Sequence, residues 1–69
     1  MNRFELRRAR RILLLTQAAM AAELAFIQQT PARTYRNWEH GSCRTPQWVE
    51  YAVKILLEKK KIKEINNEN

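Results

Sequence analysis

The sequence predicts an all-α fold, a small bundle of four to five helices. Only two prolines and one glycine interrupt its 69 residues, β-branched residues do not alternate with polar ones, and apolar residues recur at helical spacing. A chain of this length forms one domain, and on folding it buries only about 60% of the surface that the unfolded chain exposes. We therefore expect an economical helical core.

The first helix is expected from Arg3 to Leu14. Asn2 and Glu5 are spaced as in a capping box, in which each side chain bonds the backbone N–H of the other residue. Arg10 lies at the border between the apolar and the basic side of this helix. The apolar side holds Leu6, Ala9, Ile12 and Leu13, and the basic side holds Arg3, Arg7, Arg8 and Arg11.

Two further helices are expected in the middle of the chain. Thr16 is a suitable N-cap for an alanine-rich helix, whose larger apolar residues are Met20, Leu24 and Ile27. Thr30 can cap the next helix, and Pro31 suits its first position because that position needs no N–H. This helix runs to His40 and ends at Gly41, which supplies the left-handed conformation of a helix end. Either the second helix extends through Ile27 or a longer loop joins the two helices.

The last helix is expected to begin at the cap-plus-proline pair Thr45-Pro46. Its apolar residues cover an arc of about 200°, which is wider than one core contact usually needs. Orderly packing should end near Leu57 or Glu58, because the lysines that follow fall inside the apolar arc. Residues 1–58 thus form the folded domain, with the last helix over residues 46–58, and residues 59–69 form a charged tail that frays.

The charge of the chain favours a phosphate-rich partner. Thirteen lysines and arginines against seven glutamates give a net charge of +6. Every arginine precedes Pro46 and every lysine follows it, and the planar arginine fork suits phosphates and guanine edges. The alternative is a solvated basic surface on a small soluble protein.

Composition excludes several function classes. One cysteine and one histidine allow neither an internal disulfide nor a structural zinc site. Aspartate is absent, and the single glycine cannot form a phosphate-binding loop, so we expect no enzyme, no cofactor and no small-molecule ligand. The apolar run at 12–15 is too short for a membrane helix, which needs about 20 apolar residues. We expect a cytoplasmic protein without a membrane partner.

A capped second helix, a turn and a polar-faced third helix form a helix-turn-helix arrangement. Leu15-Thr16-Gln17, followed by the segment from Thr34 to Gly41 and by Pro46, resembles the Cro/C1-type (XRE-like) regulators of phages and bacteria. The stretch from Tyr35 to Pro46 is most similar to the branch with YdiL-like proteins and anti-CRISPR-associated (Aca) autorepressors. The distance from Gln17 to Thr34 is about one helical turn longer than in typical members.

The resemblance implies roles for individual residues. The third helix would lie in the major groove of double-stranded DNA and read base edges, and its neighbours would hold the DNA backbone. The base-reading residues would be Ala32, Arg33, Thr34 and Asn37, and the backbone contacts would be Thr16, Gln17, Arg36 and Arg44. Tyr35 and Trp38 match core positions, and Glu39 matches a position that pairs with an arginine of the first helix, here Arg10.

These features predict a homodimeric, sequence-specific repressor that binds an inverted-repeat operator, and the resemblance implies that it represses its own anti-CRISPR operon. The excess apolar arc of the last helix predicts a dimer interface formed by Trp48, Ala52, Val53, Leu56 and Leu57. In the alternative hypothesis, Trp48 and Leu56 complete the core of a monomer, and dimers form only on DNA. The alternative function is an RNA-binding or antitoxin-type interaction module.

Overall fold

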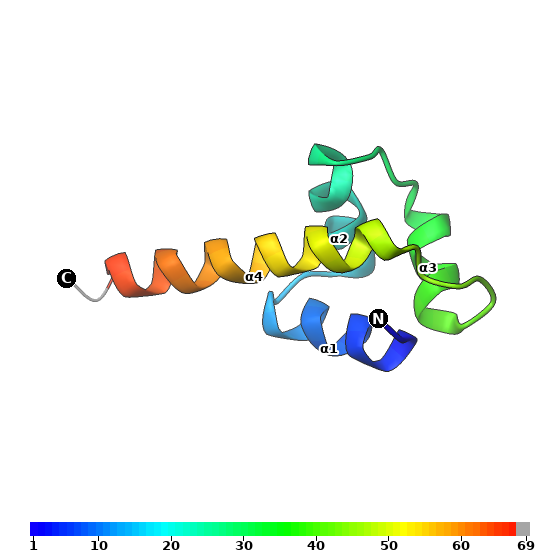
Figure 1. The fold of residues 1–69 in the computed structure, drawn as a ribbon, viewed down its shortest axis with the longest axis horizontal. Coiled ribbons are helices and arrows are strands. Elements are labelled where there is room, and N and C mark those ends of the chain that lie inside the picture. The colour runs from blue at the N-terminus through cyan, green and yellow to red at the C-terminus, as the bar shows by residue number, and fades with distance from the viewer. Residues whose placement is uncertain (68–69) are drawn as a thin grey trace.

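The computed structural model describes residues 1–67, and the side chains of residues 1–63. Its elements are α1 (Arg3–Ile12), α2 (Gln17–Glu23), a short 3-10 helix η1 (Leu24–Phe26), α3 (Ala32–His40) and α4 (Gln47–Asn67) (Figure 1). Residues 1–67 contain no strand. The prediction of an all-α bundle of four to five helices is therefore confirmed.

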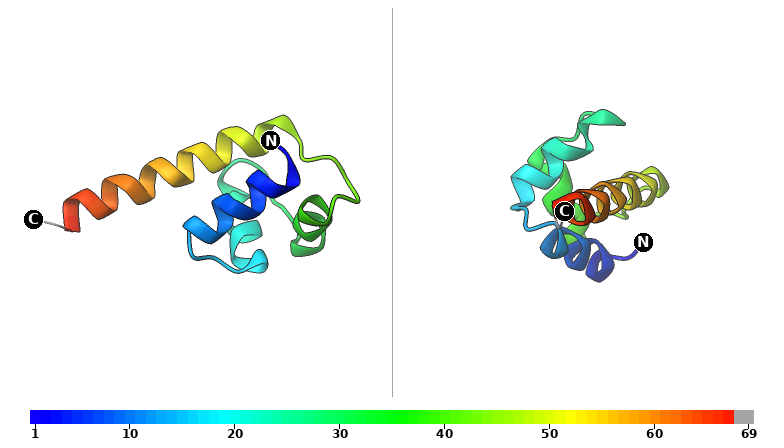
Figure 2. Two further views of the ribbon diagram at one scale, coloured as in Figure 1. Left: turned by 90° about the horizontal axis from the view of Figure 1, so that it is seen from below. Right: turned by 90° about the vertical axis from the view of Figure 1, so that its left-hand side faces the viewer.

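The first half of α4 packs against α1, α2, η1 and α3, and its second half projects beyond them (Figures 1 and 2). This projection gives the molecule its elongated shape, with extents of 43 × 22 × 20 Å. α3 lies at the opposite end of the molecule from the tip of α4. Because of this arrangement, the two ends of the molecule offer separate surfaces.

The start of α1 is as predicted, and its end is not. The Asn2 side chain accepts from the Glu5 N–H at 2.8 Å, and the Glu5 carboxylate accepts from the Asn2 N–H at 2.9 Å, which completes the capping box. The helix ends at Ile12 rather than Leu14, because Leu14 adopts φ +60° in the turn to α2. Ile12, on the apolar side of the helix, is 49% exposed and lies outside the core.

The long connection between α2 and α3 combines both predicted alternatives. Thr16 caps α2 by accepting from the Ala19 N–H at 3.1 Å. The helix then tightens into η1, and an irregular segment follows as far as Pro31. Thr30 does not cap α3, because its hydroxyl donates to the Gln28 carbonyl at 2.9 Å, and Pro31 takes the N-cap position. Ile27 is exposed in this segment and does not join the core.

Aromatic side chains join α3 to the rest of the core. The Trp38 ring meets the Tyr35 ring edge-on at 6.1 Å and the Trp48 ring edge-on at 6.0 Å. Such pairs contribute about 0.5–1.5 kcal/mol each beyond the burial of their area. The buried apolar residues are Leu6, Ala9, Met20, Ala21, Leu24, Tyr35, Trp38, Val49, Ala52, Val53 and Leu56. They come from every helix, so α3 is held in place by the shared core.

The length of α4 corrects the prediction of a fraying tail. The helix continues to Asn67 without a break at Leu57 or Glu58. Residues 59–67 are helical because lysine and glutamate are good helix formers even where no core lies beneath them. The prediction for residues 68–69 lies outside the described residues. Within the described side chains, Leu56 is the last buried one of α4, so the expected end of core packing is confirmed.

The structure also corrects the predicted dimer interface. Ala52 and Val53 are fully buried and Leu56 is nearly so, because this side of α4 forms the core of a single chain. Trp48 packs on Trp38, and Leu57 is partly buried against the same core. These five residues therefore stabilise the monomer, and three of them have no surface to offer a partner.

The two residues with positive φ give a matched pair of variants. Gly41 has φ +92°, and a Cβ there would lie 2.6 Å from Arg3 Nη1. We expect Gly41→Ala to lower the free energy of unfolding by about 1–2 kcal/mol. Leu14 also has a strained positive φ, at +60°, and is 83% exposed. Leu14→Gly should therefore raise the free energy of unfolding by about 0.5 kcal/mol. Urea unfolding measures both, and equal stability of Gly41→Ala and wild type would contradict this.

Candidate nucleic-acid interface

The candidate site is the exposed side of α3. Tyr35, Trp38 and Glu39 face the interior, and their burial fixes how the helix is rotated about its axis. At 100° per residue, Arg33 and Asn37 then lie on the side opposite the core. Arg33 is exposed and Asn37 is half-buried. The helix thus presents a polar face to solvent, as the sequence predicted.

The four predicted base-reading residues do not lie equally on this face. Arg33 and Asn37 lie near its middle, and Arg36 lies on the same face and is exposed. Ala32 and Thr34 lie at the two edges and are half-buried, with Ala32 packed against the core. The structure thus brings together three long polar side chains on one exposed surface.

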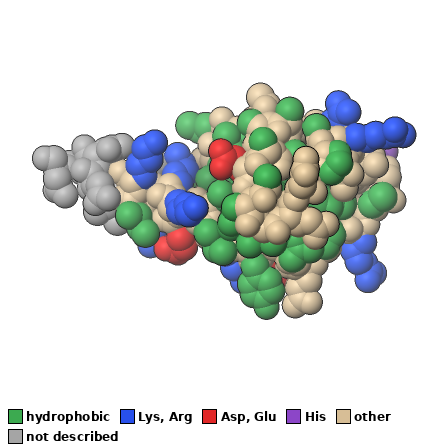
Figure 3. Space-filling view, turned by 90° about the horizontal axis from the view of Figure 1, so that it is seen from above, with side chains coloured by type: hydrophobic (Ala, Val, Ile, Leu, Met, Phe, Trp, Pro, Cys, Tyr) green, Lys and Arg blue, Asp and Glu red, His purple; other side chains and the backbone are tan. Residues whose placement is uncertain are grey.

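Arginines near this face have guanidinium groups that are free to bind a ligand. Arg33, Arg36 and Arg44 are all exposed, and none forms an ion pair within the part of the chain that the structure describes. Figure 3 shows blue side chains gathered at the end of the molecule where α3 lies. The positive charge of this end is therefore available to an anionic partner.

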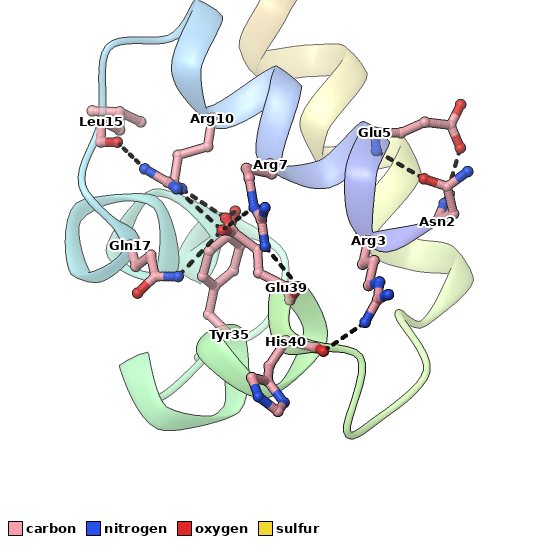
Figure 4. Close-up of polar contacts among 10 residues, drawn as sticks. All are labelled: Asn2, Arg3, Glu5, Arg7, Arg10, Leu15, Gln17, Tyr35, Glu39 and His40. Carbon is pink, nitrogen blue, oxygen red and sulfur yellow. Dashed lines mark hydrogen bonds and ion pairs between the residues drawn. The ribbon is translucent and has the colours of Figure 1, made fainter.

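The inner side of α3 is held by one buried carboxylate. Glu39 is 1% exposed, and Arg10 donates to its Oε2 through Nε at 2.7 Å and to its Oε1 through Nη2 at 3.1 Å (Figure 4). The hydroxyl of Tyr35 donates to Oε2 at 2.5 Å, and Nε2 of Gln17 donates to Oε1 at 3.2 Å. The ion pair that the resemblance implied is present, and it is bidentate. It joins α1, α2 and α3 at one point.

The ionisation of this cluster follows from its hydrogen bonds. Burial acts to raise the pKa of Glu39, but hydrogen bonds from Arg10, Tyr35 and Gln17 outweigh it, and the pKa is lowered from its ordinary value. The hydrogen bond to Glu39 raises the pKa of Arg10. Burial and the hydrogen bond to Glu39 raise the pKa of Tyr35, so its hydroxyl stays a donor. The carboxylate is therefore charged and fully paired at neutral pH.

Two arginines of α1 hold the C-terminal end of α3, and the sequence analysis missed them. Arg3 donates from Nη1 to the His40 carbonyl at 2.9 Å, and Arg7 Nε lies 3.8 Å from the Glu39 carboxylate (Figure 4). Cations at a helix C-terminus stabilise the unpaired carbonyls there. The helical wheel places both on the basic side of the first helix, opposite its apolar side. The spacing of Arg3 and Arg7 with Arg10, at i, i+4 and i+7, was the available signal that they share one stripe.

The predicted backbone contacts on α2 are partly engaged inside the protein. One amide hydrogen of Gln17 is used in the bond to Glu39, while its amide oxygen points away from the cluster (Figure 4). Thr16 is exposed, but its hydroxyl oxygen accepts the capping bond from Ala19. Both residues stand at the start of α2, and the second amide hydrogen of Gln17 has no partner in the described part of the chain.

Two kinds of feature are absent from the described residues. Among residues 1–63, no group of three or more histidine, cysteine, aspartate or glutamate side chains lies close enough to hold a metal ion. His40 Nδ1 lies 2.8 Å from the Ser42 hydroxyl, beside the end of α3. No helix among the described residues is long and apolar enough to cross a membrane.

Comparison with known families identifies the family of the chain. A family model described as Aca2/YdiL-like matches residues 1–68, which is nearly the whole chain. The chain belongs to the Aca2/YdiL-like family. Membership in the Aca2/YdiL-like family suggests an anti-CRISPR-associated regulator, and because Aca regulators bind DNA, it is consistent with a DNA partner. Searches of curated proteins and of solved structures found no significant match.

The Arg10–Glu39 pair gives a prediction for stability. Removing one partner of a buried ion pair leaves a charge unpaired, so Glu39→Gln and Arg10→Met should each lower the free energy of unfolding by about 3 kcal/mol. The double variant should lose about 1–3 kcal/mol less than the sum of the two. Thermal and urea unfolding measure all three. Glu58→Gln, which changes an exposed carboxylate, is the control, and strictly additive losses would contradict the coupling.

The lowered pKa of Glu39 gives a second prediction. A carboxyl whose pKa is lower in the folded state stabilises the fold above its unfolded pKa, here about 4.5, and loses this contribution as the pH falls through the folded value. The stability advantage of wild type over Glu39→Gln should therefore be constant near neutral pH and shrink below about pH 4.5. Urea unfolding from neutral pH down to about pH 3 measures it. An advantage independent of pH would show that the charge of Glu39 contributes nothing.

Proposed function

We propose that this chain is a sequence-specific DNA-binding repressor that acts in the cytoplasm and inserts α3 into the major groove of an operator. One observation carries the proposal: α3 is anchored by its buried side and leaves unpaired donors on its outer side. Arg33, Arg36 and Asn37 occupy that outer side, and the side chain of Asn37 makes no hydrogen bond among the described residues. A rigid helix with free polar side chains is what base reading requires.

The residue types suggest how the bases are read. Arg33 can donate two hydrogen bonds to one guanine, and Asn37 can both donate to and accept from one adenine. Ala32 and Thr34 at the edges of the face offer methyl groups, which suit contact with the methyl of thymine. These four residues together supply the base-edge contacts of the proposal.

Other residues suit the DNA backbone. Arg36 and Arg44 are exposed and form no ion pair among the described side chains, so each can neutralise a phosphate without breaking a bond described there. Gln17 can donate its second amide hydrogen to a phosphate while the first remains on Glu39. Thr16 lies beside Gln17 at the start of α2. In this arrangement the Glu39 cluster fixes the distance between the backbone contacts on α2 and the base contacts on α3.

Repression would follow from occupancy of the operator. We propose that two copies bind the two halves of an inverted repeat upstream of the chain's own operon, an anti-CRISPR operon, and block RNA polymerase. The burial of Ala52, Val53 and Leu56 supports the alternative hypothesis, in which the last helix completes the core of a monomer. Two copies would then meet on the DNA, as neighbours on one repeat, rather than as a free dimer.

The test separates base reading from backbone binding. Gel-shift titrations would use the DNA upstream of the gene, chosen for its inverted repeat, and matched duplexes with single base changes. Arg33→Ala and Asn37→Ala should each cost about 1–3 kcal/mol and relax the sequence choice at one position. Arg44→Ala should weaken binding to all duplexes alike and reduce the salt slope by about 1. Unchanged discrimination by Arg33→Ala would contradict the assignment of α3.

The same titrations test the alternative partner. Unrelated duplex and single-stranded RNA compete against the labelled operator. The inverted repeat should be the strongest competitor, and the shift should occur in two steps, because two copies bind two half-sites. A duplex with one half-site should show a single step. Preferential binding of single-stranded RNA would instead favour the RNA-binding function.

A further inference from the structure

The projecting helix α4 carries an apolar stripe that the core does not use. Tyr51, Ile55 and Ile62 are 60%, 40% and 56% exposed. Their spacing of four and seven residues puts them on one side of the helix, opposite the buried Val49, Val53 and Leu56. Phe26 of η1 is 47% exposed and lies beside the stripe, with Lys59 Nζ at 5.2 Å from its ring. Exposed apolar side chains aligned in this way mark an interaction surface.

Lysines flank this stripe on both sides. Lys54 and Lys61 follow one side of it and Lys59 lies on the other, and all three are exposed. Between Tyr51 and Lys63 the chain holds five lysines and a single glutamate, Glu58. In Figure 3, blue side chains lie beside green ones on the projection, and a red side chain lies next to them. The surface is thus an apolar strip between two cationic borders.

Charge decides which occupant fits. In a pair of identical α4 helices, parallel or antiparallel, lysine borders would face lysine borders and repel each other. A phosphate backbone would match the lysines but would leave Tyr51, Ile55 and Ile62 against water. A helix with an apolar stripe between glutamate or aspartate borders matches both features.

We propose that this surface of α4, made of Tyr51, Ile55, Ile62 and their flanking lysines, binds an acidic amphipathic helix of a partner protein. The segment from Tyr51 to Ile62 is about 17 Å long, so the partner helix needs about three to four turns. Glu58 lies in the stripe between Ile55 and Ile62, and it requires one basic residue in the middle of the partner's apolar side. The surface lies on α4, apart from the outer side of α3.

The probe is a synthetic helical peptide of about five turns. It carries leucines along one side, one central lysine among them, and glutamates on both borders, and a second peptide carries lysines in place of these glutamates. Fluorescence anisotropy with the full chain should show binding of the acidic peptide, weakened by salt, and no binding of the basic one. Equal binding of the two peptides overturns the proposal, and this comparison requires no variant of the chain.

Variants locate the binding surface. Ile62→Ser should lower the affinity for the acidic peptide about tenfold, because Ile62 supplies one third of the stripe. Lys59→Glu with Lys61→Glu should reverse the preference toward the basic peptide. The matched control, Arg8→Glu with Arg11→Glu, changes the net charge equally on exposed residues of α1 and should leave the preference for the acidic peptide intact. If the control variant also lost its preference for the acidic peptide, net charge alone would explain the reversal in the lysine variant, and the proposal would be overturned.

A second copy is the competing occupant, and sedimentation distinguishes it. We expect the free chain to sediment with a mass near 8.3 kDa at micromolar concentration. A free dimer that Ile62→Ser dissociates would assign the stripe to self-association and overturn the proposal. Circular dichroism confirms that each variant keeps its helices. The peptide and sedimentation experiments contain no DNA. They can therefore overturn this proposal without affecting the proposed DNA-binding function, and the gel-shift titrations can overturn that function without affecting this proposal.

Discussion

The buried carboxylate of Glu39 is the interaction on which the rest of the structure depends. A charge taken out of water is tolerated only when it is paired and its lone pairs are filled, and here Arg10, Tyr35 and Gln17 fill them. Each donor comes from a different part of the chain, so the carboxylate keeps its partners only when α1, α2 and α3 stand in one arrangement. A cluster that is satisfied in a single geometry specifies that geometry more sharply than apolar contacts do.

The arginines fall into two groups with different structural roles. Arg3, Arg7 and Arg10 of α1 reach the C-terminal end of α3. Arg7 and Arg10 pair with the Glu39 carboxylate, and Arg3 and Arg7 donate to backbone carbonyls at the end of α3. Arg33, Arg36 and Arg44 remain exposed and unpaired within the described residues. The net charge of the chain is therefore larger than the positive charge that is available to a ligand near α3. These three arginines, together with Asn37, define a small surface beside α3.

The helix α4 is likewise divided along its length. Its first half closes the core through Val49, Ala52, Val53 and Leu56, and Trp48 extends the aromatic chain that starts at Tyr35. Its second half leaves the body of the molecule, so its apolar residues have no core to enter. The same helix thus stabilises the end of the molecule that carries α3 and presents a second surface at the other end. These 69 residues thus present two separate faces.

The sequence by itself determined the features that depend on near neighbours. The capping box at Asn2, the Thr16 cap, the aromatic anchors of α3 and the left-handed Gly41 all follow from spacing within one or two turns. Only the tertiary structure decided which part of the wide apolar arc of α4 meets the core, because that depends on how other helices cross it. It also decided that Arg3 and Arg7 bond to α3, since the carbonyls that accept from them belong to the end of that helix, which is distant in sequence. The positive φ of Leu14 and the exposure of Ile12 likewise belong to the turn between α1 and α2, and no local pattern in the sequence predicts them.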